Sequence, residues 1–185
     1  WTLLTFSGYL TIGNKRDINV YELRMPNYEL KFVFKNIILH WFTTEVKIIR
    51  NLLEDTANSL VNNQLEKFGE GFKKIIGDTF SYYDTESQPE KVYQAYVLGL
   101  LAILSDDYII RSNRESGEGR YDIMLIPRDK SQNGVVMEIK QIEKKSGETD
   151  KKLESRVKRK LKSALKQIEK NRYFMELLEY GVTKI

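Results

Sequence analysis

Residues 121–140 read YDIMLIPRDKSQNGVVMEIK, and this segment predicts two strands joined by a polar loop. The apolar runs 121–126 and 135–140 have the length and composition of strands that are covered on both faces. The intervening residues 127–133 begin with proline and are otherwise mostly polar, as expected of a surface loop. The segment therefore predicts a buried antiparallel hairpin.

Both predicted strands carry charged residues inside apolar runs. Asp122 lies in the first strand, and Glu138 and Lys140 lie in the second. Because strand side chains alternate between two faces, Glu138 and Lys140 point to the same face. Pairing Ile126 with Gly134 places Asp122 directly opposite Glu138, with about 4.5–5.5 Å between their Cβ atoms. The hairpin would therefore gather the three charged groups at one position.

Two carboxylates at that separation repel each other unless a cation lies between them. A hard, oxygen-seeking ion such as Mg²⁺ or Mn²⁺ fits this donor set. Lys140 would then flank the metal, where it could orient a water or stabilise charge developing on a phosphate. The alternative is a buried ion pair between Lys140 and one of the carboxylates, although each desolvated ion needs its own partner. The pattern leaves both interpretations open.

The composition excludes several other kinds of catalytic site. The chain has no cysteine, which excludes disulfides, thiolate metal sites and cysteine nucleophiles and fits a reducing cytoplasmic location. It has one histidine, His40, so a zinc site of several histidines is excluded. His40 lies in an apolar stretch and is interpreted as a partly buried helix residue. Hydrolytic chemistry would rest on carboxylates, lysine and a hard metal.

Charge is distributed unevenly along the chain. The net charge is +4, but residues 151–172 contain ten Lys or Arg against two Glu, which gives +8 there and −4 elsewhere. Such a block is either a solvated helix face or the electrostatic footprint of a nucleic-acid binder.

The order of predicted elements favours an α/β or α+β fold. No apolar run reaches the ~18 residues of a membrane span, and the first residues do not resemble a signal peptide. The absence of an initial Met leads us to expect a fragment of a longer chain. The predicted elements are strands at 8–13 and 19–25, helices at 29–53 and 59–80, a helix at 89–104, strands at 108–112, 121–126 and 135–140, a helix at 151–180, and a possible strand at 182–185.

The sequence also resembles a known family. Asp122 followed by Glu138-x-Lys140 has the form of the PD-(D/E)XK nuclease motif. The surrounding sequence resembles one branch of that superfamily, in which the nuclease domain commonly follows an AAA-ATPase-like domain. The segments that carry this resemblance are SNRESGEGRYDIM at 112–124, FSGYL at 6–10, YELRMPN at 21–27, YVLGLL at 96–101, and ALKQI at 164–168 with Tyr173 downstream.

The resemblance implies a restriction-endonuclease-like core with a mixed central sheet flanked by helices. This core would span residues 81–185, after a mainly helical extension at 1–80 that leads toward a missing ATPase-like domain. Asp122 and Glu138 match the metal ligands, and Lys140 matches the catalytic lysine. Glu90 matches an acidic residue that often completes the metal site, although a glutamate in the first turn of a helix is also favoured by the helix dipole alone.

Two further positions follow from the same comparison. Gln167 matches a polar residue on the following helix that positions phosphate or water, although it could equally cap a backbone group. Gln94 departs from the family, which often has histidine there, and this leaves one fewer polar group near Glu90.

The expected activity is Mg²⁺- or Mn²⁺-dependent cleavage of nucleic acid, with DNA favoured over RNA by analogy to the family. The alternative is a catalytically weak or inactive module of a larger ATPase-linked protein that binds nucleic acid or protein. Neither reading predicts an oligomeric state. The residues expected to contact nucleic acid are Arg114, Arg120, Lys158, Lys162 and Lys166, each of which could instead be merely solvated.

Overall fold

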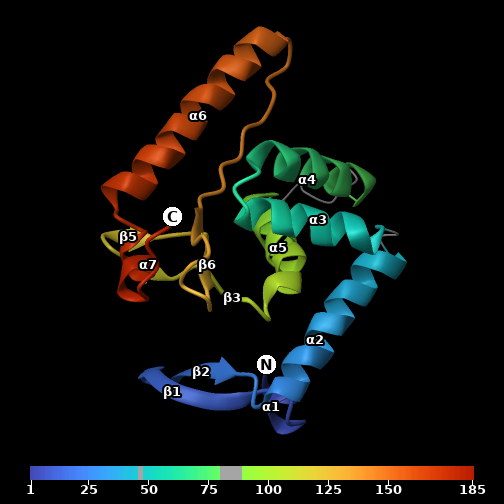
Figure 1. Ribbon diagram of the computed structural model, residues 1–185, viewed down its shortest axis with the longest axis vertical. Coiled ribbons are helices and arrows are strands. Elements are labelled where there is room, and N and C mark those ends of the chain that lie inside the picture. The colour runs from blue at the N-terminus through green and yellow to red at the C-terminus, as the bar shows by residue number, and fades with distance from the viewer. Residues whose placement is uncertain (46–47, 80–88) are drawn as a thin grey trace. The chain divides into compact units, whose positions relative to one another are not determined.

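The computed structural model of the chain describes residues 1–45, 48–79 and 89–185. The chain forms two compact units, Trp1–Lys47 and Ile48–Ile185, each of which is considered by itself (Figure 1). No helix in the described part of the chain has the length and hydrophobicity needed to cross a membrane.

The first unit consists of a short helix, a β-hairpin and a longer helix. Asn27 caps the longer helix by accepting a hydrogen bond from the Leu30 amide at 3.0 Å. The elements are α1 (Thr2–Phe6), β1 (Thr11–Asp17), β2 (Val20–Arg24), α2 (Tyr28–His40) and a π-helical turn (Trp41–Glu45).

Two predictions for this unit were wrong in their boundaries. The expected turn at 14–17 belongs to β1, and the chain reverses instead around Asn19, whose φ of 62° suits a tight turn. The expected helix at 29–53 does not continue as one α-helix, because α2 ends at His40 and the next α-helix starts at Arg50. Apolar spacing cannot distinguish one helix from two helices that share its period.

The second unit combines helices with small antiparallel sheets. Its helices are α3 (Arg50–Val61), α4 (Leu65–Thr79), α5 (Pro89–Leu101) with a 3₁₀ turn (Ala102–Leu104), α6 (Asp150–Lys170) and α7 (Met175–Glu179). Its strands are β3 (Tyr108–Ser112), β4 (Glu115–Ser116), β5 (Gly119–Arg120), β6 (Ile123–Pro127) and β7 (Val135–Met137).

Two predicted helices are each divided by a residue with left-handed backbone conformation. Asn63, with φ of 58°, separates α3 from α4, so the helix expected at 59–80 starts at Leu65 instead. Arg172, with φ of 52°, lies between α6 and α7, so the helix expected at 151–180 is two helices, Asp150–Lys170 and Met175–Glu179. A residue in this conformation ends the α-helical hydrogen-bond ladder.

The principal sheet has the order β3-β6-β7, and both pairings are antiparallel. Leu125 pairs with Val135 and Ile123 with Met137, which confirms the offset predicted from the sequence. A mixed sheet was expected, but every strand pairing in the described residues is antiparallel, so the fold is α+β. The expected strand at 182–185 is also absent from these residues, although the Lys184 carbonyl accepts a hydrogen bond from the Gly134 amide at 2.7 Å.

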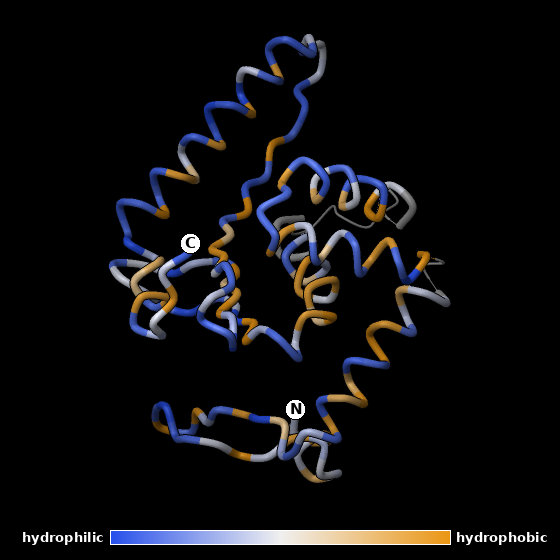
Figure 2. Tube along the Cα trace, in the orientation of Figure 1, coloured by the Kyte–Doolittle hydropathy of each residue, from blue (hydrophilic) through white to orange (hydrophobic). Residues whose placement is uncertain are grey.

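Strand β6 lies at the centre of the second unit. Ile123, Met124, Leu125 and Ile126 have no exposed surface. Side chains on one face of β6 pack against α3 and α5, and those on the other face pack against residues near α7. Figure 2 shows this apolar centre in contrast to the largely hydrophilic α6. Burying each such side chain stabilises the fold by about 1.5–3 kcal/mol.

Helix α3 belongs to the same core. Ala57, Leu60 and Val61 cluster with Val97 and Leu125. The compact units therefore divide between Lys47 and Ile48, whereas the sequence suggested a domain boundary near residue 80. The sheet that carries Asp122 thus rests on helices from both sides of that predicted boundary.

Candidate active site

Asp122 and Glu138 lie at neighbouring ends of two paired strands. Asp122 immediately precedes β6, and Glu138 immediately follows β7. The ladder ends at the Ile123–Met137 pair, one residue short of both carboxylates. Beyond the ladder, Oδ2 of Asp122 accepts a hydrogen bond from the Ile139 amide at 2.7 Å. This contact keeps the two chain segments together where the strands end.

The Glu138 side chain is almost fully buried, at 4% exposed. Its Oε1 atom accepts hydrogen bonds from Lys140 Nζ at 2.5 Å and from Gln167 Nε2 at 2.7 Å. Its Oε2 atom is buried and makes no hydrogen bond to any residue that the structure describes. Burying a carboxylate oxygen without a hydrogen-bond partner costs free energy, so we infer that this atom binds a ligand.

The charge state of Glu138 reflects the same surroundings. Burial raises the pKa of the carboxyl group above its ordinary 4.5, although the hydrogen bond from Lys140 opposes this effect. The negative charge of Asp122 raises the pKa further, and the hydrogen bond from Gln167 lowers it. Glu138 therefore lacks sufficient positive charge around it to offset its burial.

Carboxylate oxygens such as those of Asp122 and Glu138 are the donors that a hard divalent cation prefers. Mg²⁺ commonly binds through one or two carboxylates and completes its shell with waters and substrate phosphates. Among the described residues, no group of three His, Cys, Asp or Glu side chains could hold a metal ion. The third predicted ligand, Glu90, lies in the first turn of α5, but its side chain is outside the described residues. The donors available for this fit are therefore Asp122 and Glu138.

Gln167 connects α6 to the site. Besides its bond to Glu138, its amide donates to the Tyr173 hydroxyl at 3.1 Å, and Asn171 donates to the same hydroxyl at 2.9 Å. Tyr173 is only 1% exposed and packs edge-on against Tyr121, with ring centroids 6.3 Å apart. The Gln167 side chain thus contacts other side chains and does not cap a backbone group.

Gln94 is a contributor whose role the sequence did not reveal. This α5 residue is 7% exposed, and its amide donates to the main-chain carbonyl of Asp122 at 3.0 Å and to Ser112 Oγ at 3.4 Å. The sequence does place a glutamine on the otherwise apolar face of a helix. Because a buried amide needs hydrogen-bond partners, this position could have indicated the contact. Gln94 therefore supports the backbone of Asp122.

The residues predicted to contact nucleic acid make none of the side-chain contacts described above, and their role stays a prediction. Lys158, Lys162 and Lys166 are exposed, and a helical rotation of about 100° per residue puts them about 100–180° around α6 from Gln167. Arg120 is exposed and pairs with Glu115 at 3.8 Å. Arg114, also predicted, is exposed in the turn before β4. The basic residues that this rotation puts within about 90° of Gln167 are Lys152, Arg156, Arg159, Lys160 and Lys170.

Comparison with known proteins supports a nuclease relationship. The model of the PD-(D/E)XK nuclease superfamily matches residues 88–185, just over half of the chain. No curated protein and no solved structure matches the chain. The chain therefore belongs to the PD-(D/E)XK nuclease superfamily, and the expected ATPase-associated branch remains a prediction.

Proposed function

We propose that this member of the PD-(D/E)XK nuclease superfamily hydrolyses phosphodiester bonds in nucleic acid, with DNA as the preferred substrate. The site would consist of Asp122, Glu138 and Lys140. The observation that carries the proposal is the buried Oε2 of Glu138, which makes no hydrogen bond to any described residue.

A divalent cation, Mg²⁺ or Mn²⁺, would be held by Asp122 and Glu138, with Glu90 as the third ligand that the family resemblance implies. When bound, such an ion activates water as a nucleophile and neutralises charge on the phosphate. Hydrogen bonds within the protein support a metal-binding role for Asp122. The Asp122 carboxylate is held by the Ile139 amide, and its backbone is held by Gln94. Asp122 is thereby oriented before a substrate binds, as Glu138 is by Lys140 and Gln167.

Lys140 supplies positive charge at the same position. Its ammonium group lies 2.5 Å from Oε1 of Glu138, and its side chain is 23% exposed. A partly buried ammonium group stabilises negative charge more strongly than a solvated one, because the surrounding dielectric is lower. Lys140 would therefore stabilise the charge that develops on the phosphate, while Gln167 keeps Glu138 in place.

Calorimetric titration with Mg²⁺ and Mn²⁺ tests the metal-binding part of the proposal. We expect the parent protein to bind either ion, and we expect Asp122→Asn and Glu138→Gln to lose that binding. Both substitutions keep the side-chain volume and remove one charge. A parent protein that binds neither ion would contradict the proposal. That outcome would favour the alternative of a catalytically inactive module that binds nucleic acid or protein.

We also propose, from the family resemblance alone, that this chain works together with an ATPase-like domain in the same polypeptide. Cleavage by the full-length protein with and without ATP would test that association.

A further inference from the structure

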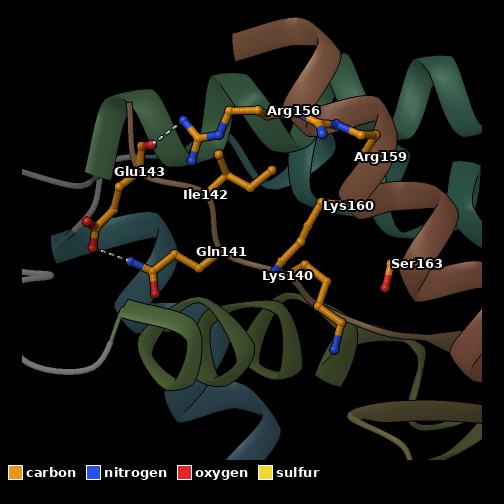
Figure 3. A pocket seen from close by; sticks show the side chains of 8 residues that line it. All are labelled: Lys140, Gln141, Ile142, Glu143, Arg156, Arg159, Lys160 and Ser163. Atoms are coloured by element: carbon orange, nitrogen blue, oxygen red, sulfur yellow. Dashed lines mark hydrogen bonds between the residues drawn. The ribbon is translucent and has the colours of Figure 1, made fainter. Parts of the chain in front are cut away.

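An open cavity of about 760 Å³ lies beside Lys140 in the second unit. One wall is the segment that follows β7, and the other is the face of α6 that also carries Gln167. We call this cavity the basic pocket. Figure 3 shows Arg156 and Lys160 extending from α6 toward the 140–143 segment. The pocket is lined by Lys140, Gln141, Ile142, Glu143, Arg156, Arg159, Lys160 and Ser163.

The lining of the basic pocket is strongly cationic. Lys140, Arg156, Arg159 and Lys160 contribute four positive charges against the single negative charge of Glu143, a net of +3. A concave surface that carries charge of one sign concentrates ions of the opposite sign. The pocket is therefore suited to an anion.

The arginines and lysine of α6 have different roles in the pocket. Arg156 donates to Oε2 of Glu148 at 2.6 Å and to the Glu143 carbonyl at 3.2 Å, which ties the connecting segment to α6. Arg159 and Lys160 are exposed and form no ion pair with any residue in the described part of the chain. Arg156 thus shapes the wall, whereas Arg159 and Lys160 have their charges available for a ligand.

We propose that the basic pocket binds a backbone phosphate of the substrate strand, about three nucleotides from the phosphate that is cleaved. This inference rests on the proposed function, because Lys140 lines the pocket and also contacts Glu138. Arg159 and Lys160 bind the phosphate oxygens, since guanidinium and ammonium groups are the usual phosphate donors in proteins. Ser163 supplies a hydroxyl group at the same wall.

Helix geometry gives the reach of the strand. Lys160 precedes Gln167 by seven residues, a rise of roughly 10 Å along α6 at 1.5 Å per residue. Successive nucleotides of one strand advance about 3.4 Å along B-form DNA, so this span corresponds to about three nucleotides. The ligand is therefore a polynucleotide that extends about three nucleotides past the cleaved bond.

Fluorescence anisotropy with a labelled 15-nucleotide single strand tests this assignment without cleavage, in buffer that contains EDTA. The pocket variant is Arg159→Gln/Lys160→Gln, and the matched control is Lys73→Gln/Lys74→Gln, which removes the same charge from exposed residues of α4 that do not line the pocket. We expect the pocket variant to bind about tenfold more weakly. Its plot of log K against log salt should flatten by about 1.4, the value for two phosphate contacts on a single strand. The control should change the affinity less than about threefold. Equal weakening in both variants would overturn the proposal.

A competition with dTMP addresses the length of the ligand. We expect an unlabelled 15-nucleotide strand to displace the labelled strand, and we expect dTMP at the same phosphate concentration to leave it bound. Displacement by dTMP as effective as by the strand would mean that the pocket is a mononucleotide site and would overturn the proposal. A cleavage assay tests the proposed function separately from these binding experiments. If Glu138→Gln abolishes cutting while the pocket variant binds normally, the function stands and the basic pocket has been misassigned.

Discussion

Gln167 donates a hydrogen bond to Oε1 of Glu138 at 2.7 Å and so links α6 to the end of β7. The same oxygen accepts a second hydrogen bond from Lys140. The position of the candidate metal ligand therefore depends on a residue 29 positions later in the chain. This relationship makes Gln167 a positioning residue for Glu138.

Replacement of Gln167 should reduce activity more than stability. In Gln167→Ala, Glu138 keeps Lys140 but loses the contact that orients its carboxylate. Loss of such a supporting contact at metal sites typically costs about 10–100-fold in metal affinity or activity. We expect a reduction of that size in kcat/KM and a loss of about 1 kcal/mol in the free energy of unfolding.

The matched control for this measurement is Glu169→Ala, at an exposed position of the same helix. Steady-state cleavage kinetics and urea unfolding should be measured for both variants. Parental kinetics in Gln167→Ala, together with clear destabilisation, would show that Gln167 only holds the fold.

Replacement of Glu138 should remove activity without weakening the fold. At neutral pH, Glu138→Gln removes a buried charge that burial and Asp122 both disfavour. The amide can still accept hydrogen bonds from Lys140 and Gln167. We expect cleavage to be lost and Tm, measured without divalent ions, to equal or exceed that of the parent.

The pH dependence of this difference has a defined sign. Because the pKa of Glu138 is raised in the folded state, its contribution to stability is present below the ordinary value of 4.5 and is lost as pH rises through the folded-state pKa. Any stability advantage of Glu138→Gln should therefore disappear as the solution is acidified. A lower Tm for Glu138→Gln at pH 7 would instead support a structural ion pair between Glu138 and Lys140.

Gln94 should contribute to stability through the backbone of Asp122. In Gln94→Leu, the Asp122 carbonyl loses one donor but keeps the Asn113 amide at 3.1 Å. We therefore expect a loss of about 1 kcal/mol in the free energy of unfolding by urea, at the low end for a buried polar group. The exposed Gln132→Leu serves as the control. Equal effects for the two variants would contradict a specific role for Gln94.

The contact between Glu148 and Arg156 should give stability with the opposite pH dependence. The hydrogen bond from Arg156 lowers the pKa of Glu148 below 4.5. Its contribution is therefore present above pH 4.5 and is lost as pH falls through the folded-state pKa. We expect Glu148→Gln to be less stable than the parent at pH 7 and the difference to shrink below pH 4.5 in chemical unfolding experiments. A difference that stays constant over this range would contradict the assignment.

The sequence predicted the register of the hairpin because two constraints acted together there, although β7 ends at Met137 and the predicted strand continued to Lys140. Apolar strands of known length and a loop of fixed length allow few pairings, and the observed pairing of Leu125 with Val135 has the predicted offset. The breaks at Asn63 and Arg172 were missed because the apolar spacing continues through both positions. The local sequence pattern therefore predicted the strand pairing but not the ends of the helices.

The site was only partly predictable for a related reason. Asp122 and Glu138 stood out as charges within predicted apolar strands, although both lie just beyond the strand ends. Gln94 donates to a backbone carbonyl, which every residue has, so the sequence does not identify its partner. Only the tertiary structure shows that the partner is Asp122. Likewise, the basic segment was evident from composition, but only the contact of Gln167 shows which side of α6 faces the site.

Cleavage of supercoiled and single-stranded DNA with Mg²⁺ or Mn²⁺ tests the central claim most directly. The parent should be compared with Lys140→Ala and with Lys144→Ala, a control at an exposed lysine that pairs with Asp150. We predict that the parent and Lys144→Ala cut DNA and that EDTA abolishes this activity. Lys140→Ala should be at least roughly a hundredfold slower. Metal-dependent cutting by Lys140→Ala at the parental rate would contradict the account.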